Sequence, residues 1–509
     1  MTVKAFALTT IASMLIGSAS ASPAGQSAVN AVLQRLPKPK TVLTAKASDL
    51  AEAAAVAIFS NPDLAPDEIV AGALEPLGGK VRKDRATAAS LIITAALSLG
   101  TADSPGLTSF TNADVANIAY ALVAVNAGGD QALPEAGKAA VAGAALKNVP
   151  GAALEIGQFV SEGAALGNKT AFTAGAITGL LGGINAAEHA KDFVTGVLNS
   201  VGGITDPKDV FAGTISMALR SDSTVLGQVV NVIATNATLS DQVSIAAAAI
   251  RNAPKSATEI TRGVAQLIPP SGNQSNRSAF AVLLINNFGL RNYAASIALG
   301  VSLTDPEFAC DITQSVVTAN SFTKATAAKI AATVANSVDG EDASEISDKL
   351  GDLIRQGQLN VTSAAAIAKA IAGTQFVINS DLDLEAVASS MTLDLMNMPG
   401  AVSDPAILKA IYNVAKYVGG LSTAYAKKHH TTDFSDAVAG AVTDSLVSTT
   451  AFSDIPTTVQ DSIIAGLKKT LRAASRPAVN FAIDNARNTV GNQYQVGPIL
   501  DAETPATTF

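Results

Sequence analysis

The densest group of side chains that could do chemistry lies late in the chain, where Lys427–His430 is followed by Asp433. Imidazole and carboxylate groups together can bind a transition metal. However, adjacent histidines point away from each other on a helix, and the two lysines repel a cation. We therefore interpret this stretch as a solvated loop between helices.

The one other histidine, His189, follows Glu188. A zinc-binding helix of the His-Glu-X-X-His type needs a second histidine at a fixed distance on the same face, and none follows here. We expect His189 to lie on the surface of a helix.

Two short acidic stretches carry the hard oxygen ligands that calcium prefers: Asp339–Asp342 with Glu345, and Asp381, Asp383 and Glu385. Neither stretch has the full spacing of an EF-hand loop. Both come just before predicted helices, where acidic groups stabilise the positive end of the helix dipole. We expect them to act at helix starts and not as metal ligands.

Motifs for nucleophilic or phosphate chemistry are absent from the sequence. There is no Gly-X-Ser-X-Gly elbow, Walker loop or Gly-X-Gly-X-X-Gly turn. The single cysteine, Cys310, falls in the first turns of a predicted helix, where a small buried apolar role fits it. We assign no catalytic, cofactor-binding or metal-binding residue, although carboxylates from distant segments could still meet in the fold.

A repeated tripeptide marks the elements that would position any site. Thr-Asp-Pro at 205–207 recurs at 304–306, and Ser-Asp-Pro follows at 403–405, each time after 99 residues. An Asp side chain can accept hydrogen bonds at a helix start, and proline fits the first helical position. We therefore expect Asp206, Asp305 and Asp404 to cap helices. The interval of 99 residues equals three units of 33, and a unit of about 33 residues has room for two helices. The spacing therefore indicates an array of two-helix units.

A second repeat has the order cation, Asn, small residue and Pro, at Lys147–Pro150 and again 104 residues later at Arg251–Pro254. This order predicts the end of a helix, and both copies precede Ala-X-Glu-Ile. Ser256 with Glu259 predicts a capping box for the next helix. Because 104 is close to three units of 35, we expect degenerate repeats of roughly 33–35 residues.

Composition supports thin, layered packing. Hydrophobic residues make up 48% of the chain, whereas aromatic residues make up only 4% and tryptophan is missing. Small side chains allow helix axes to approach closely, and strand patterns are weak throughout. We expect an all-α fold, namely an α-solenoid of degenerate two-helix repeats. The tetratricopeptide and ankyrin patterns are absent. A HEAT-like stack is the nearest architectural comparison, on the basis of unit length and helix pairing alone.

The chain ends differ in character from the repeats. The order of Lys4, an apolar stretch and Ala19–Ala21 predicts a bacterial signal peptide over 1–21. We expect an N-terminal arm or linker over 22–44, a helical-repeat domain over 45–488 and an extended or disordered tail over 489–509. No apolar run long enough for a membrane span follows the signal, so we expect a secreted protein in the periplasm, on the cell surface or outside the cell.

Charge and motif content together limit the function. The formal net charge of −8 argues against a nucleic-acid surface, which needs a basic stripe. We expect an alanine-rich structural scaffold that binds protein partners or associates with itself, without catalysis, cofactor or an evident small-molecule site. Two alternatives stay open: a secreted all-α hydrolase with acidic catalytic residues from separate helices, and a periplasmic protein-binding or chaperone-like module.

Overall fold

The computed structural model describes the chain in ten segments, which contain helices and turns and no strand. The all-α class is confirmed for this part of the chain. The expected signal peptide at 1–21 and the tail from residue 490 onward lie outside it. The described segments are 23–64, 66–74, 89–92, 94–95, 112–124, 133–163, 166–181, 189–269, 275–319 and 322–489.

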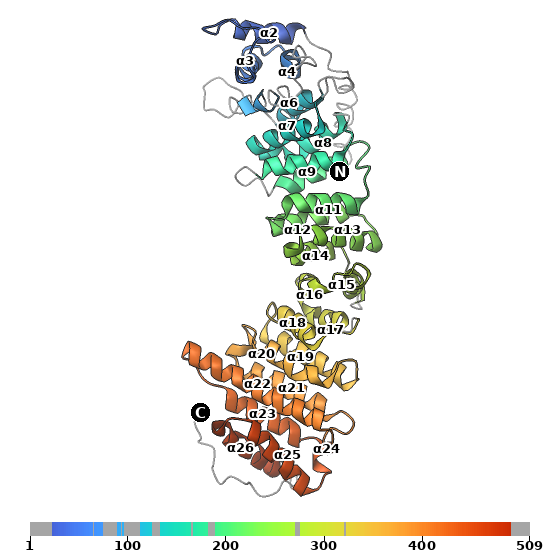
Figure 1. The fold of residues 1–509 in the computed structure, drawn as a ribbon, viewed down its shortest axis with the longest axis vertical. Helices are drawn as coiled ribbons and strands as arrows, with labels where there is room; N and C mark the ends of the chain where they lie inside the picture. Colours follow the sequence, from blue (N-terminus) through green and yellow to red (C-terminus); the bar gives the residue numbers. More distant parts are fainter. Residues whose placement is uncertain are drawn as a thin grey trace. The chain divides into compact units, whose positions relative to one another are not determined.

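The chain divides into two compact units, Met1–Leu267 and Ile268–Phe509. In the first unit, α7, α9, α11 and α13 pack on one another in chain order as one layer, and α2, α4, α6, α8, α10, α12 and α14 form a second layer (Figure 1). The helices of this unit are α2 (Pro23–Leu33), α3 (Ala47–Ser60), α4 (Pro66–Leu74), α6 (Asn112–Ala124), α7 (Glu135–Asn148), α8 (Ala153–Gly163), α9 (Lys169–Leu180), α10 (Ala190–Asn199), α11 (Lys208–Leu219), α12 (Ser223–Ala234), α13 (Leu239–Asn252) and α14 (Ala257–Ala265).

The second unit repeats this scheme. Odd-numbered helices from α15 to α23 form one layer, which α26 continues, and α16, α18, α20, α22 and α25 form the other. The helices are α15 (Ser275–Asn287), α16 (Ala294–Ser302), α17 (Ala309–Thr318), α18 (Lys324–Ala335), α19 (Gly340–Arg355), α20 (Ala364–Ala372), α21 (Asp381–Met396), α22 (Pro405–His429), α23 (Ser435–Val447), α24 (Thr450–Ser453), α25 (Thr457–Thr470) and α26 (Arg476–Thr489).

Several helix pairs are joined by a single turn of 3-10 helix. These turns are η2 (Pro150–Ala152), η4 (Pro254–Ser256), η5 (Arg291–Tyr293), η6 (Pro306–Phe308), η7 (Val361–Ser363), η8 (Val377–Asn379) and η9 (Ala473–Ser475). Serial packing of helix pairs in two layers is the arrangement of an α-solenoid.

The Lys147–Pro150 repeat marks equivalent positions, as predicted. Helix α7 ends at Asn148 and α13 ends at Asn252, and in each case proline opens the following 3-10 turn. The two Asn side chains even make the same bond: Nδ2 donates to Ala144 O at 2.7 Å and to Ala248 O at 2.9 Å. The predicted capping box is wrong, because Ser256 Oγ bonds the Ser223 hydroxyl at 2.9 Å instead.

The Asp-Pro repeat has a different outcome at each copy. Asp404 caps α22 as predicted, since its Oδ1 accepts from Ala406 N at 2.7 Å. The prediction is wrong for Asp206, because Pro207 itself occupies the N-cap of α11. It is also wrong for Asp305, which precedes a 3-10 turn and makes no cap hydrogen bond. The copy at 403–405 starts α22, which packs in the layer of α16, α18 and α20, whereas the copy at 304–306 precedes α17 of the opposite layer. The 99 residues between these two copies therefore do not separate equivalent positions of the repeat.

Asp305 instead forms an ion pair with Arg277 at 2.5 Å, and Arg277 Nε donates to Ile268 O at 3.1 Å. Both charged side chains are largely buried. We expect Asp305→Ala to lower the free energy of unfolding of the second unit by about 2 kcal/mol, because Arg277 loses its partner. Urea unfolding followed by circular dichroism measures this. Asp206→Ala is the matched control and should change stability by less than about 0.5 kcal/mol; equal losses in both variants would contradict the assignment.

Glycines permit the closest helix contacts. A Cβ on Gly263 of α14 would lie 2.2 Å from Gly227 O of α12, and one on Gly227 would lie 2.5 Å from Glu259 O. The same pairing joins Gly143 to Gly179 in the other layer. Small side chains were expected to let the helices approach closely. At these glycines, the backbone of one helix lies directly against the backbone of its neighbour.

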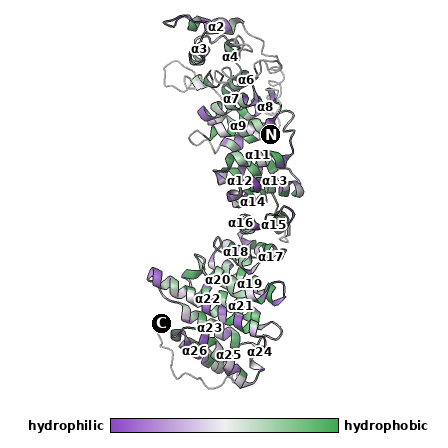
Figure 2. Cartoon of the chain, in the orientation of Figure 1, coloured by the Kyte–Doolittle hydropathy of each residue, from purple (hydrophilic) through white to green (hydrophobic). Residues whose placement is uncertain are grey.

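Hydropathy is spread over the whole set of helices. In Figure 2, hydrophobic and hydrophilic residues are interspersed and form no continuous apolar block. Within the described segments, no helix combines the length and apolar character that crossing a membrane requires.

Candidate functional site

One layer of the second unit is strongly acidic. Helices α17, α19, α21 and α23, here called the acidic layer, carry 12 Asp and Glu residues against two basic residues, Lys349 and Arg355. Most of the 12 acidic side chains are exposed or half-buried, and Asp394 alone is buried. They are Asp311, Glu341, Asp342, Glu345, Asp348, Asp352, Asp381, Asp383, Glu385, Asp394, Asp436 and Asp444.

The opposite layer is basic. Helices α18, α20 and α22, here called the basic layer, carry seven lysines and no Asp or Glu. All seven are exposed: Lys324, Lys329, Lys369, Lys409, Lys416, Lys427 and Lys428. Figure 1 shows α18, α20 and α22 stacked beside α17, α19 and α21. The second unit therefore presents opposite charge on its two faces.

The two acidic stretches from the sequence come together in the acidic layer. Gly340 starts α19 against Asp383 of α21, and a Cβ on Gly340 would lie 2.1 Å from the Asp383 carboxylate. The predicted role at helix starts is confirmed for Asp339, which caps α19 by accepting from Asp342 N at 3.0 Å. Burial first, and then the neighbouring acids, raise the pKa of Asp342. Across the described segments, no cluster of His, Cys, Asp and Glu has an arrangement that could hold a metal ion.

A buried carboxyl group lies between α19 and α21. Asp394 is 7% exposed, its Oδ1 is 3.3 Å from Arg355 Nε, and its Oδ2 has no hydrogen-bond partner. Burial raises the pKa of Asp394 to about 7, and the negative charges of Asp352 and Asp348 add to this effect while Arg355 opposes it. The Asp394 carboxyl group therefore stays protonated at acidic pH and loses its proton near neutral pH.

The basic layer contains a groove of about 480 Å³. Tyr425 and His429, one helical turn apart on α22, stack there with ring centroids 4.3 Å apart. The groove offers amide, hydroxyl, imidazole and ammonium groups beside apolar wall atoms. It is lined by Asn336, Gly373, Gln375, Ile378, Asn379, Leu421, Ala424, Tyr425, Lys428 and His429.

The interpretation of Lys427–His430 as a loop is wrong. Helix α22 extends through His429, so both lysines belong to its last turn, and His430 ends it in the left-handed conformation with φ of 54°. Positive side chains at this end are favoured by the helix dipole. Asp433 does not join the histidines. It pairs with Arg472 from the segment after α25.

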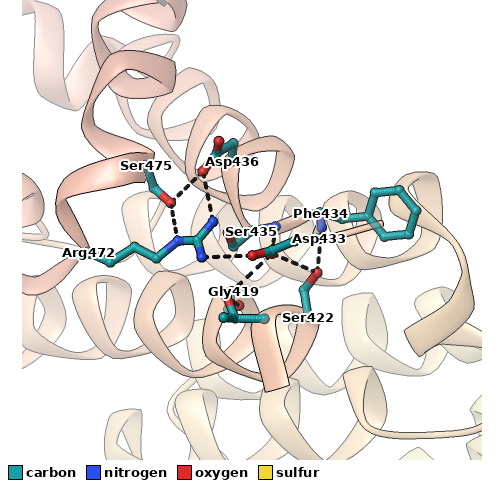
Figure 3. A network of polar contacts seen from close by, with 9 residues as sticks. Gly419, Ser422, Asp433, Phe434, Ser435, Asp436, Arg472 and Ser475 are labelled. Atoms are coloured by element: carbon teal, nitrogen blue, oxygen red, sulfur yellow. Dashed lines mark hydrogen bonds and ion pairs between the residues drawn. The ribbon is translucent and has the colours of Figure 1, made fainter. Parts of the chain in front are cut away.

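Arg472 connects the start of α23 to the start of α26. Figure 3 shows the guanidinium between two carboxylates: Nη1 is 2.7 Å from Asp433 Oδ2, and Nη2 is 3.4 Å from Asp436 Oδ1. Ser475 accepts from Arg472 Nε at 3.1 Å and donates to Asp436 at 2.6 Å. Burial alone would raise the pKa of Asp433, but the hydrogen bond from Ser435 N and the contact with Arg472 outweigh it and lower the pKa. This network holds the last helices together.

We expect Arg472→Met to lower the stability of the second unit by about 1 kcal/mol at neutral pH, because the partly exposed ion pairs are lost. The native-state pKa of Asp433 is depressed, so this contribution is present above the ordinary carboxyl pKa of about 3.9 and disappears as the pH falls further. Urea midpoints at several pH values measure the difference. A difference between variant and parent that grows on acidification would contradict the role of Asp433.

Two further candidates from the sequence are His189 and Cys310. His189 is the N-cap residue of α10, half-buried, with Nδ1 3.9 Å from Asp192. Cys310 is buried as predicted, and burial, aided by Asp311 and Glu345, raises the pKa of its thiol to about 12. A thiol with this pKa is protonated at neutral pH and is a weak nucleophile.

The first unit has a groove of its own, about 550 Å³ in volume, between α7 and α9. Its walls are mainly alanine and glycine, with Glu135 and Lys147 as the charged members. Gly143 and Gly179 face each other in its wall, where a Cβ on Gly179 would lie 2.8 Å from Gly143 Cα.

Comparison with known proteins does not add a function: no protein-family model and no curated protein matches this chain. The separation of charge between the layers was missed by the sequence reasoning. The signal was present, because acidic and basic helices alternate along residues 309–447, but it becomes visible only once alternate helices are assigned to different layers.

Proposed function

We propose that this chain is a secreted bacterial scaffold built from HEAT-like repeats, which acts by binding protein partners or by associating with itself and not by catalysis. Serial helix pairs expose long, continuous faces that suit protein contacts. The order of charged, apolar and small residues over 1–21 supports secretion.

The observation that carries this proposal is the opposite charge of the two layers in the second unit. Seven exposed lysines face outward from the basic layer, and the exposed acids of α19 and α23 face outward from the acidic layer. Charged faces of this kind steer association and select partners.

The test is the mass of the purified chain, measured by light scattering after size-exclusion chromatography at low salt and supported by negative-stain imaging. We expect species larger than one chain, with a mass that rises with protein concentration. A monomer of 51.2 kDa or slightly less at every concentration would count against a self-associating scaffold.

A hydrolase is the second candidate. Burial and the charge of nearby Asp352 raise the pKa of Asp394 to about 7, and a carboxyl group that keeps its proton near neutral pH can serve as a general acid. Neither groove described above is lined by these two residues. Turnover of a nitrophenyl glycoside or ester that Asp352→Asn and Asp394→Asn both abolish would establish the hydrolase instead of the scaffold.

A further inference from the structure

We propose that the acidic layer of one copy of this chain docks on the basic layer of a second copy. This inference rests on the proposed function and names the two surfaces involved. One copy then offers a basic face to one neighbour and an acidic face to another.

The basic layer has the size of a docking surface. Lys409, Lys416 and Lys427 are exposed along α22, whose 25 residues span about 37 Å at 1.5 Å per residue. Lys369 of α20 extends the charge sideways, with its ammonium group 5.5 Å from the centre of the Tyr417 ring. Helices in such layers lie about 8–10 Å apart, so three neighbouring helices give a face roughly 20 Å wide.

The acidic layer matches it in pattern. Glu341, Glu345, Asp348 and Asp352 follow at intervals of four, three and four residues, which places them on one side of α19. Asp444 is exposed on α23, two helices along the same layer. The acidic layer thus presents rows of negative side chains, and the basic layer presents rows of positive side chains, each on a stack of neighbouring helices.

Little of this charge is neutralised within the chain. Among described residues, none of the seven lysines forms an ion pair. In the acidic layer, Arg355 pairs with Asp352 and Asp394, and Arg472 pairs with Asp436. Acids of like charge next to one another repel, and at Asp342 the charges of Asp339, Glu345 and Glu341 add to burial in raising the pKa. A surface of opposite sign relieves this repulsion on both faces.

A second copy is the partner that the charges favour, because both complementary faces are present on the same unit. The two faces are different surfaces, so the contact is heterologous. A heterologous contact that does not close into a ring produces an open-ended assembly. This provides a route to a structural role without any further component.

The experiment compares three charge-reversal variants of the full chain by light scattering at low salt. The first reverses the basic layer (Lys416→Glu, Lys427→Glu and Lys428→Glu), and the second reverses the acidic layer (Glu341→Lys, Asp348→Lys and Asp444→Lys). The control, with the same charge change as the first, reverses exposed lysines of the first unit (Lys147→Glu, Lys191→Glu and Lys255→Glu). Thermal melting by circular dichroism establishes that each variant is folded.

We expect the parent chain and the control to assemble, and each layer variant alone to remain monomeric. An equal mixture of the two layer variants should assemble again, because the intact acidic face of one meets the intact basic face of the other. If the folded layer variants assemble like the parent, the inference is wrong while a self-associating scaffold stands. If the parent itself is monomeric under all conditions, the proposed self-association fails as well.

Discussion

Replacing Gly263 by alanine is expected to destabilise the first unit by about 2 kcal/mol or more. Its Cβ would lie 2.2 Å from the carbonyl oxygen of Gly227, which belongs to the backbone of α12 and cannot rotate away. Overpacking of this kind costs about 1–3 kcal/mol, and the backbone contact places this site at the upper end. Separating α12 from α14 would also lengthen the bond from Asn231 Nδ2 to Gly263 O, now 2.6 Å.

Gly440 provides the matched control for Gly263. It also lies within a helix, α23, but a Cβ there meets no atom within 4 Å. Gly440→Ala should therefore raise stability by about 0.5–1 kcal/mol through the higher helix propensity of alanine. Urea unfolding of both variants measures the effects. Stabilisation by Gly263→Ala comparable to that of Gly440→Ala would mean that α12 and α14 are not in contact there.

Asp394→Asn is expected to remove a pH dependence of stability in the second unit. The native-state pKa of about 7 lies above the ordinary value, so the native state binds more protons than the unfolded state between about pH 4 and 7. Stability in the parent chain therefore falls as the pH rises through this window, by an amount on the order of a few kcal/mol, and stays low above it. Asparagine resembles the protonated carboxyl group and cannot ionise.

The measurement is the urea midpoint of parent and variant at about pH 5 and pH 8. We expect nearly equal midpoints at the lower pH and a clearly more stable variant at the higher pH. As a control, Asp444→Asn changes an exposed residue of the same layer, and its urea midpoint should equal that of the parent at both pH values. A parent chain whose second unit is more stable at pH 8 than at pH 5 would contradict the assignment.

Helix pairing could be predicted from the sequence because its signals are local. The order of cation, Asn and Pro ends a helix at both places where it was singled out, Lys147–Pro150 and Arg251–Pro254. Capping depended on tertiary structure. Asp206 and Asp305 have the same immediate neighbours in sequence, and neither caps a helix. Pro207 occupies the N-cap of α11, and Asp305 pairs with Arg277 instead.

The candidate site was harder to predict for the same reason. Charges on α19 and α20 are close in sequence, and only the packing of α18 on α20 and of α19 on α21 sorts them onto different faces. The sequence around Asp394 does not indicate that this residue is buried, because the apolar residues of α21 are not confined to one face. The burial of Asp394 depends on Gly351 of the neighbouring helix, where a Cβ would lie 2.3 Å from Asp394 Oδ2.

The most direct test of a scaffold that works through its charged faces is the mass of the full chain as salt is raised. Opposed charges on exposed surfaces are screened beyond about 10 Å at 0.1 M salt and beyond about 3 Å at 1 M. We therefore expect light scattering to show assemblies at about 50 mM sodium chloride that dissociate to monomers by about 500 mM. Assemblies that persist or grow at high salt would show that apolar contacts, and not the two charged layers, hold the copies together.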